Sequence, residues 1–237
     1  MKPNPASRKA HPPAIDRRRL RRVFERLLAH HGPQHWWPHD GHPFEIMIGA
    51  VLTQNTAWTN VEKAMERLRR ARALTARRIL ALPQGELAEL IRPSGYYNIK
   101  ADRLQHLCRW YQEGGGFQVL NEWDTATLRR SLLAVKGVGP ETCDDILLYA
   151  FERPVFVVDA YTFRLFQRLG LIEEGHRYES LRAAVETAIG PHTAFFNELH
   201  ALVVRHCSGT CKPRPLCQSC PLRRQCAYNR QLVAQPR

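Results

Sequence analysis

The chain has 237 residues, 44% of them hydrophobic and 24% charged, so it can bury a core as one large or two small domains. No apolar run reaches the roughly 18 residues that a membrane-spanning helix requires, and we expect a soluble protein. The formal net charge of +13 and the pI of about 9.9 favour a polyanionic partner, with nucleic acid ahead of a membrane surface.

The predicted elements follow a basic, proline-rich stretch at residues 1–19, which lacks the apolar core of a secretory signal. We expect this stretch to be a flexible tail and the protein to be cytoplasmic. Helical periodicity begins at Leu20 and continues along most of the chain. After the first helix, further helices are predicted over residues 44–55, 58–72, 84–92, 98–112, 124–134, 141–151, 160–169, 177–189 and 192–206.

Two segments depart from the helical pattern. Gly114–Gly116 is typical of a flexible connection. Pro154–Val158 has β propensity but no pairing partner nearby, so we predict a buried connector. The fold class is therefore predicted to be all-α, and no repeat of fixed period points to a solenoid.

A glycine turn joins two helical patterns at Lys136-Gly137-Val138-Gly139, which predicts a hairpin between helices. Glycines accept a positive φ and carry no side chain, so such a turn can approach a phosphate and direct backbone N–H groups toward it. An isolated Gly-x-Gly turn is more often an ordinary helix connection. The flanking sequence decides between the two.

Asp159 follows an apolar run and precedes a new helical pattern, and it is the candidate catalytic carboxylate. A fixed carboxylate can stabilise the positive charge that develops on a sugar when an N-glycosidic bond breaks, or it can help water to attack. The alternative is that Asp159 only caps its helix. The two roles are compatible.

Five of the seven cysteines lie in the last 31 residues, which indicates a metal site formed by thiolates in a reducing compartment. Four of them are separated by five, two and five residues, and Cys207 precedes them. Thiolates of this kind suit an iron–sulfur cluster or a structural zinc ion. The four candidate ligands are Cys211, Cys217, Cys220 and Cys226.

The hairpin with its flanking Leu132–Thr142 segment, followed by Val157–Gly170, resembles the helix-hairpin-helix glycosylase signature of the endonuclease III family, also called the HhH-GPD superfamily. The resemblance covers about residues 34–230. It implies a DNA repair N-glycosylase of base-excision repair that flips a damaged base out of double-stranded DNA. The family expectation is a monomer.

The resemblance also implies DNA-contacting residues outside the hairpin. Gln54 matches the family glutamine that fills the gap left by the flipped base, although alone it would be an unremarkable residue at a helix end. Tyr97, Asn98 and Lys100 match a segment that contacts the DNA backbone or wedges the strand. The alternative is a helix start that Asn98 caps, with Lys100 exposed to solvent.

The cysteine spacing is similar to the C-terminal iron–sulfur loop of endonuclease III, so the resemblance implies a [4Fe-4S] cluster in the loop 207–226. The first spacing here is five residues, one shorter than usual in the family, and Cys207 is an alternative first ligand. Zinc bound by the same thiolates is the alternative cofactor.

Glu141 occupies the position where bifunctional members of the family carry the lysine that forms a Schiff base. A carboxylate cannot form that imine, so a monofunctional enzyme is expected and AP lyase activity is doubtful. Lys136 or Lys100 would supply only a displaced amine.

The tryptophans Trp36 and Trp37, with Phe44, look closest to the 3-methyladenine DNA glycosylase branch, where aromatic residues line the base pocket. Indole faces would attract a cationic alkylated purine. The alternative is that these residues belong to the core. The alternative functions are a bifunctional endonuclease III-like glycosylase and AP lyase on oxidised pyrimidines, and a non-catalytic module that binds damaged DNA.

By analogy with the family, two domains are expected. One is a central helical domain at residues 34–150, with the helix-hairpin-helix at about 128–150. The other combines residues 20–33 with 151–237 and ends in the cysteine loop.

Overall fold

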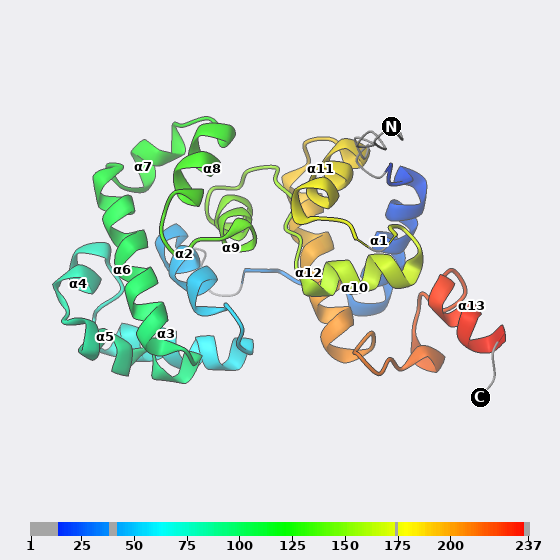
Figure 1. Cartoon of the computed structure of the whole chain (residues 1–237), viewed down its shortest axis with the longest axis horizontal. Coiled ribbons are helices and arrows are strands. Elements are labelled where there is room, and N and C mark those ends of the chain that lie inside the picture. The colour runs from blue at the N-terminus through cyan, green and yellow to red at the C-terminus, as the bar shows by residue number, and fades with distance from the viewer. Residues whose placement is uncertain (1–13, 38–41, 174, 235–237) are drawn as a thin grey trace, which may run out of the picture. The chain divides into compact units, whose positions relative to one another are not determined.

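The computed structural model describes residues 14–37, 42–173 and 175–234 of the chain (Figure 1). The described part is helical and contains no strand, and none of its helices is long and apolar enough to span a membrane. The chain forms two compact units. We call residues 35–157 with 193–198 the hairpin unit, and the remainder the cysteine unit.

The hairpin unit is built around α2 (Pro43–Leu52), in which all residues except Pro43 and Glu45 are buried. This helix packs against α3, α6, α9 and η2. The other helices of the unit are α3 (Trp58–Arg70), α4 (Ala76–Ala81), α5 (Gln84–Leu90), η1 (Arg92–Ser94), α6 (Tyr97–Glu113), α7 (Gly116–Asn121), α8 (Thr125–Leu133), α9 (Pro140–Asp145) and η2 (Ile146–Ala150).

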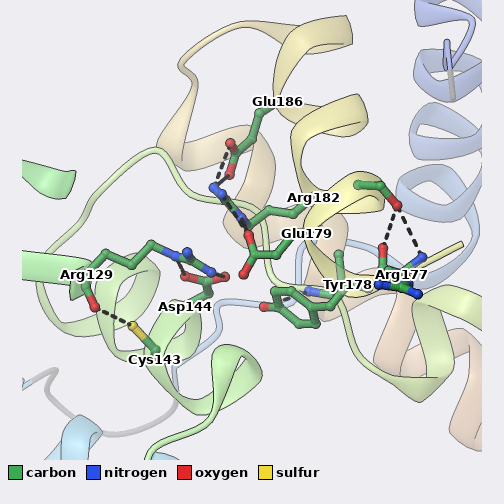
Figure 2. Close-up of polar contacts among 10 residues, drawn as sticks. Arg129, Cys143, Asp144, Arg177, Tyr178, Glu179, Arg182 and Glu186 are labelled. Carbon is green, nitrogen blue, oxygen red and sulfur yellow. Dashed lines mark hydrogen bonds and ion pairs between the residues drawn. The ribbon is translucent and has the colours of Figure 1, made fainter. Parts of the chain in front are cut away.

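The predicted hairpin is formed by α8 and α9. Asp124 caps α8 by accepting a hydrogen bond from the Thr127 N–H, and Pro140 starts α9. Arg129 of α8 donates from Nε and Nη2 to the two carboxylate oxygens of the fully buried Asp144, at 2.7 and 3.1 Å. Figure 2 shows this forked contact. A bidentate pair fixes geometry as well as distance, so it holds the two hairpin helices in one arrangement.

The cysteine unit contains α1 (Arg17–His31), α10 (Ala160–Leu169), α11 (Tyr178–Ile189), α12 (Thr193–Gly209) from Leu199 on, η3 (Cys217–Ser219) and α13 (Ala227–Ala234). Helix α10 runs from Asp159 at its N-cap to Gly170, whose left-handed conformation ends the helix. On α11, Arg182 pairs with both Glu179 and Glu186, as drawn in Figure 2.

The buried connector predicted at Pro154–Val158 is confirmed, and it lies where the hairpin unit ends. Val155–Val158 is non-helical and buried. Phe156 packs on Phe196 at the start of α12, with ring centroids 5.7 Å apart, and Thr193 donates to the Glu152 carbonyl. In the structure, the hairpin unit extends to Val157 and the cysteine unit resumes at Val158.

Several helix boundaries differ from the prediction. Residues 1–13 of the expected tail lie outside the described residues, but Arg17–Arg19 belong to α1, because Asp16 caps that helix through the Arg19 N–H. The short helices α4, α7 and α13 were not predicted, since six to eight residues carry little periodicity. The Gly114–Gly116 segment is not an open connection: it ends α6 and begins α7 directly.

Lys100 on α6 joins two helix ends inside the hairpin unit. Its side chain is 1% exposed, and its ammonium donates to the carbonyls of Leu52 and Ser94 at 2.8 and 2.7 Å. Both carbonyls lie at the end of a helical segment, where no backbone donor is available. Burial lowers the pKa of Lys100 from 10.5 to about 8, and the charge of Arg103 adds to this effect.

The lowered pKa of Lys100 predicts how the stability of the protein depends on pH. Between about pH 8 and 10.5 the unfolded chain keeps the Lys100 proton that the folded chain has lost, so this group makes unfolding less favourable as the pH rises. Below pH 8 both states are protonated, and the contribution does not change with pH. In urea titrations, we expect the unfolding free energy of the wild type to increase relative to that of Lys100→Met between pH 7.5 and pH 10. A pH-independent difference would contradict the assigned pKa.

Candidate functional site

The hairpin turn offers free backbone donors. Gly137 has a φ of +91°, and among the described residues the N–H groups of Gly137 and Gly139 make no hydrogen bond. Val138 is buried and its N–H bonds to the Val135 carbonyl, so it anchors the turn. The Lys136 side chain is exposed and pairs with Asp102 at 3.0 Å. Such a turn has the donors and the charge that suit a phosphate group.

Gln54 lies in the turn between α2 and α3 and reaches the hairpin. Its amide nitrogen donates to the Gly137 carbonyl at 3.1 Å and to the Thr142 hydroxyl at 2.8 Å. Its amide oxygen accepts a hydrogen bond from Arg103. The structure therefore brings together Gln54 and the hairpin, which are far apart in the sequence.

The segment before α6 exposes an aromatic side chain that the sequence did not single out. Tyr96 has a φ of +46° and is 66% exposed. Tyr97 is half-buried and lies under the Arg92 guanidinium, 5.7 Å from its ring centroid. Asn98 is exposed inside α6, so it does not cap the helix. A bulky apolar residue in a rare backbone conformation marks a position where tertiary structure imposes the geometry.

Lys100 is a correction to the expected DNA contacts. Its ammonium is buried and bonded to two carbonyls, so it does not face a phosphate in this structure. The same burial removes it as an amine for a Schiff base. Its part in the site is to hold the Ser94 end of the segment that carries Tyr96.

Trp36 and Trp37 belong to an aromatic cluster in the hairpin unit, which also contains two residues that the sequence reasoning missed. Trp58 lies with its ring centroid 4.7 Å from Trp36 and 5.1 Å from Trp37, and Tyr149 lies 5.5 Å from Trp37. The three tryptophans are only partly buried. The Trp58 indole N–H donates to Glu62 at 3.0 Å. A partly open aromatic cluster is suited to stacking on a planar ring.

Phe44 does not belong to this cluster. It is 3% exposed and packs on Tyr111, with ring centroids 5.0 Å apart. The expectation that Phe44 lines the base pocket is therefore not supported by its position, because α2 turns this side chain into the core. Trp58, four residues after Gln54 at the start of α3, takes the place expected of Phe44 beside the tryptophans.

Asp159 is a buried carboxylate that remains ionised. Its Oδ1 accepts hydrogen bonds from the N–H and the hydroxyl of Thr162, at 2.6 and 2.7 Å. Burial alone would raise the pKa of Asp159, but His200 and the Thr162 hydrogen bonds outweigh it and hold the pKa below its ordinary value. The carboxylate is thus both the helix cap and a fixed negative charge.

His200 is a further candidate residue that the sequence did not reveal. Its Nε2 lies 3.8 Å from Asp159 Oδ2, the oxygen that Thr162 does not use. His200 comes from α12, forty-one residues after Asp159, and no local spacing signals this contact. The imidazole is placed to orient the carboxylate or to share a proton with it.

The four candidate ligands Cys211, Cys217, Cys220 and Cys226 line a single pocket in the cysteine unit, together with His206 and Arg168. The pocket has an empty volume of about 350 Å³, part of which is open to solvent. Among the described residues, no three His, Cys, Asp or Glu side chains are close enough together to hold one metal ion.

Arg168 and Cys207 act on the first of these cysteines. Arg168 donates to Cys211 Sγ at 3.3 Å and to the carbonyl of Lys212. A hydrogen bond from Cys207 lowers the pKa of Cys211 to about 6 against the opposing effect of burial, and Arg168 contributes to the decrease. Cys207 itself does not line the pocket, and its thiol faces the Tyr161 carbonyl at 3.6 Å. Cys211 is better placed than Cys207 as the first ligand.

Known proteins match this chain over most of its length. The family model of the HhH-GPD superfamily base excision DNA repair protein matches residues 48–191. A putative DNA repair glycosylase of Methanocaldococcus jannaschii, MJ1434, is 41% identical over 86% of this chain and 94% of its own. Endonuclease III of Thermotoga maritima is 30% identical over 79% of this chain and 84% of its own. The crystal structure of H. pylori 3-methyladenine DNA glycosylase (MagIII) bound to 1,N6-ethenoadenine has a TM-score of 0.69 and 30% identity, covering 81% of this chain and 97% of that one.

The family match includes Gln54, the hairpin and Asp159. It confirms the all-α fold class and the function expected from the resemblance, a DNA glycosylase of base-excision repair with damaged DNA as its partner. The chain belongs to the HhH-GPD superfamily of base excision DNA repair proteins.

Proposed function

We propose that the protein is a monofunctional DNA glycosylase that releases alkylated purines by hydrolysis. The observation that carries the substrate class is the aromatic cluster of Trp36, Trp37, Trp58 and Tyr149. A cationic alkylated base gains about 0.5–2 kcal/mol from cation–π contact with such rings, in addition to stacking. The similarity to a 3-methyladenine DNA glycosylase supports the same class.

Asp159 supplies the charge that the reaction needs. As the N-glycosidic bond breaks, positive charge develops on the sugar, and a preorganised carboxylate stabilises it more than solvent does. The low pKa of Asp159 keeps the carboxylate ionised at neutral pH. Thr162 fixes Oδ1, which leaves Oδ2 with His200 as the oxygen that acts on the sugar or on a water molecule.

Glu141 supports hydrolysis rather than strand cleavage. It is exposed in the first turn of α9, at the position where a bifunctional enzyme has its lysine, and a carboxylate forms no imine. Lys136 is exposed but paired with Asp102. We therefore expect the abasic product to remain intact.

Base flipping would use the hairpin unit. The free N–H groups of Gly137 and Gly139 suit a backbone phosphate, and Gln54 and the exposed Tyr96 are the candidates for filling the space of the flipped nucleotide. Tyr96 brings an apolar ring, which suits insertion between base pairs.

The first test is base release from two duplexes, one containing 3-methyladenine and one containing thymine glycol. We expect release of the alkylated base, with strand breaks only after alkali, because the chain lacks the imine-forming lysine. Asp159→Asn should lower the single-turnover rate by at least about 100-fold, since it removes the charge but keeps the helix cap. Damaged-duplex binding should persist in this variant.

Two other results would each exclude this proposal, and a third would exclude the role of Asp159. Thymine glycol release with alkali-independent breaks would identify a bifunctional enzyme on oxidised pyrimidines. An absence of release by wild type and Asp159→Asn alike, with binding to damaged DNA retained, would identify a binding module. Release that is unchanged in Asp159→Asn would remove the role given to this carboxylate.

The aromatic cluster can be tested without deleting a ring. A Cβ at Gly49 would lie 2.6 Å from Trp37 Cζ2, so Gly49→Ala displaces the indole. We expect slower release of the alkylated base and a loss of roughly 1–3 kcal/mol of stability from overpacking. The control is Gly85→Ala on α5, where a Cβ meets nothing within 4 Å and release should be unchanged. Equal release by the two variants would argue against Trp37 as part of the base pocket.

We also propose that the cysteine pocket holds a [4Fe-4S] cluster. The four cysteines line one pocket in the described residues, and zinc held by the same thiolates is the alternative occupant. Four thiolates are the usual ligands of such a cluster, and they suit a group with several iron atoms. The cluster would join the loop after α12 to α13.

The cluster predicts a visible property of the purified protein. We expect a brown preparation with broad absorption near about 400 nm and roughly four iron atoms per chain. Cys211→Ser should lose iron, while Cys207→Ser should retain it, because Cys207 does not line the pocket. A colourless protein that contains zinc would contradict the proposal, and iron loss in Cys207→Ser alone would make Cys207 the first ligand.

A further inference from the structure

The Gln54 side chain is held from three sides in the hairpin unit. Both N–H donors of its amide are used, one by the Gly137 carbonyl at 3.1 Å and one by the Thr142 hydroxyl at 2.8 Å. The amide oxygen accepts from the Arg103 guanidinium. These partners come from the hairpin turn, from α9 and from α6, so the side chain connects three segments.

Arg103 contacts the same hairpin turn with another part of its side chain. A Cβ at Gly137 would lie 2.2 Å from Arg103 Cγ and 2.8 Å from Cδ, so the methylene stem lies directly over this glycine. The neighbouring Asp102 pairs with Lys136 on the turn. Consecutive residues of α6 therefore contact consecutive residues of the hairpin.

The chemistry of these partners selects one orientation of the amide. A guanidinium has only donors, so it requires the amide oxygen, and the Gly137 carbonyl has only acceptors, so it requires the amide nitrogen. The Thr142 hydroxyl both donates and accepts, so it accommodates either orientation. Without Arg103, the oxygen would lose its charged donor, and the Gly137 carbonyl would be the one remaining partner that selects the orientation.

We propose that Arg103 is a positioning residue for base excision, which holds Gln54 in the orientation and place from which it fills the gap left by the flipped base. The proposal rests on the role of Gln54 given above. Arg103 acts through Gln54, and its other contact, with Gly137, links the placement of Gln54 to the turn that binds phosphate. Among the described residues, Gln54 is the one side chain or carbonyl that accepts a hydrogen bond from Arg103.

The test is a double-mutant cycle of Arg103→Met and Gln54→Ala, with single-turnover base release measured on a damaged duplex from which the wild type releases the base. Methionine keeps an apolar stem over Gly137 and removes the donor. We expect Arg103→Met to slow release about tenfold, the size of one hydrogen bond to a charged group. In the Gln54→Ala background the same substitution should have no further effect.

Two controls separate positioning from other roles of Arg103. Arg109→Met removes an exposed arginine from the same helix, and we expect Arg103→Met to reduce affinity for undamaged duplex no more than this control does. Thr142→Val should slow release less than Arg103→Met, because the hydroxyl does not select the amide orientation. Arg103→Lys, which keeps a donor, should recover part of the rate. All rates are taken well below the lowest Tm, so that every variant is folded.

The outcomes distinguish this inference from the proposed function. A wild type that releases no base from any duplex would overturn the proposed function and this inference with it. Release by the wild type with additive effects of the two substitutions would overturn the inference alone. A loss of duplex affinity that accounts for the slower release would instead make Arg103 a direct phosphate contact.

Discussion

The ion pair between Arg129 and Asp144 is the contact on which the geometry of the hairpin unit depends. Asp144 is fully buried, and a buried charge without a partner is strongly unfavourable, so α8 and α9 are held in the one arrangement that satisfies it. That arrangement sets the turn between them. The Gly137 carbonyl then faces inward to Gln54, while the N–H groups of Gly137 and Gly139 are left for a phosphate.

In the hairpin unit, several of the positively charged side chains bind groups of the protein itself. Lys100 donates to two carbonyls, Arg129 to a carboxylate and Arg103 to an amide, all within the unit. These long side chains provide donors where helix ends and a buried acid lack them. The net charge of +13 therefore overstates how many cations are available to DNA. On the hairpin, Lys136 and Arg130 remain exposed.

In the cysteine unit, α10 carries residues of two candidate sites, the Asp159 carboxylate and the cysteine pocket. Its N-cap is Asp159, held by Thr162, and its later turns carry Arg164 and Arg168, which donate to the Cys211 carbonyl. His200, beside Asp159, lies on α12, and the cysteine loop begins where that helix ends. The candidate catalytic carboxylate and the cysteine pocket thus share the helices α10 and α12.

Helical periodicity, glycine turns, caps and cysteine spacing are local patterns, so the all-α class, the helical hairpin and the cysteine loop could be predicted from the sequence, and Asp159 could be named as a candidate. Which of these side chains are accessible, and which ones contact each other, depends on the packing of the helices. It buried Lys100 and Phe44, exposed Tyr96, and brought Trp58, His200 and Arg103 to the candidate sites. Each of those outcomes depends on contacts between residues distant in the chain, and spacing along one helix carries no information about which face a distant helix will cover.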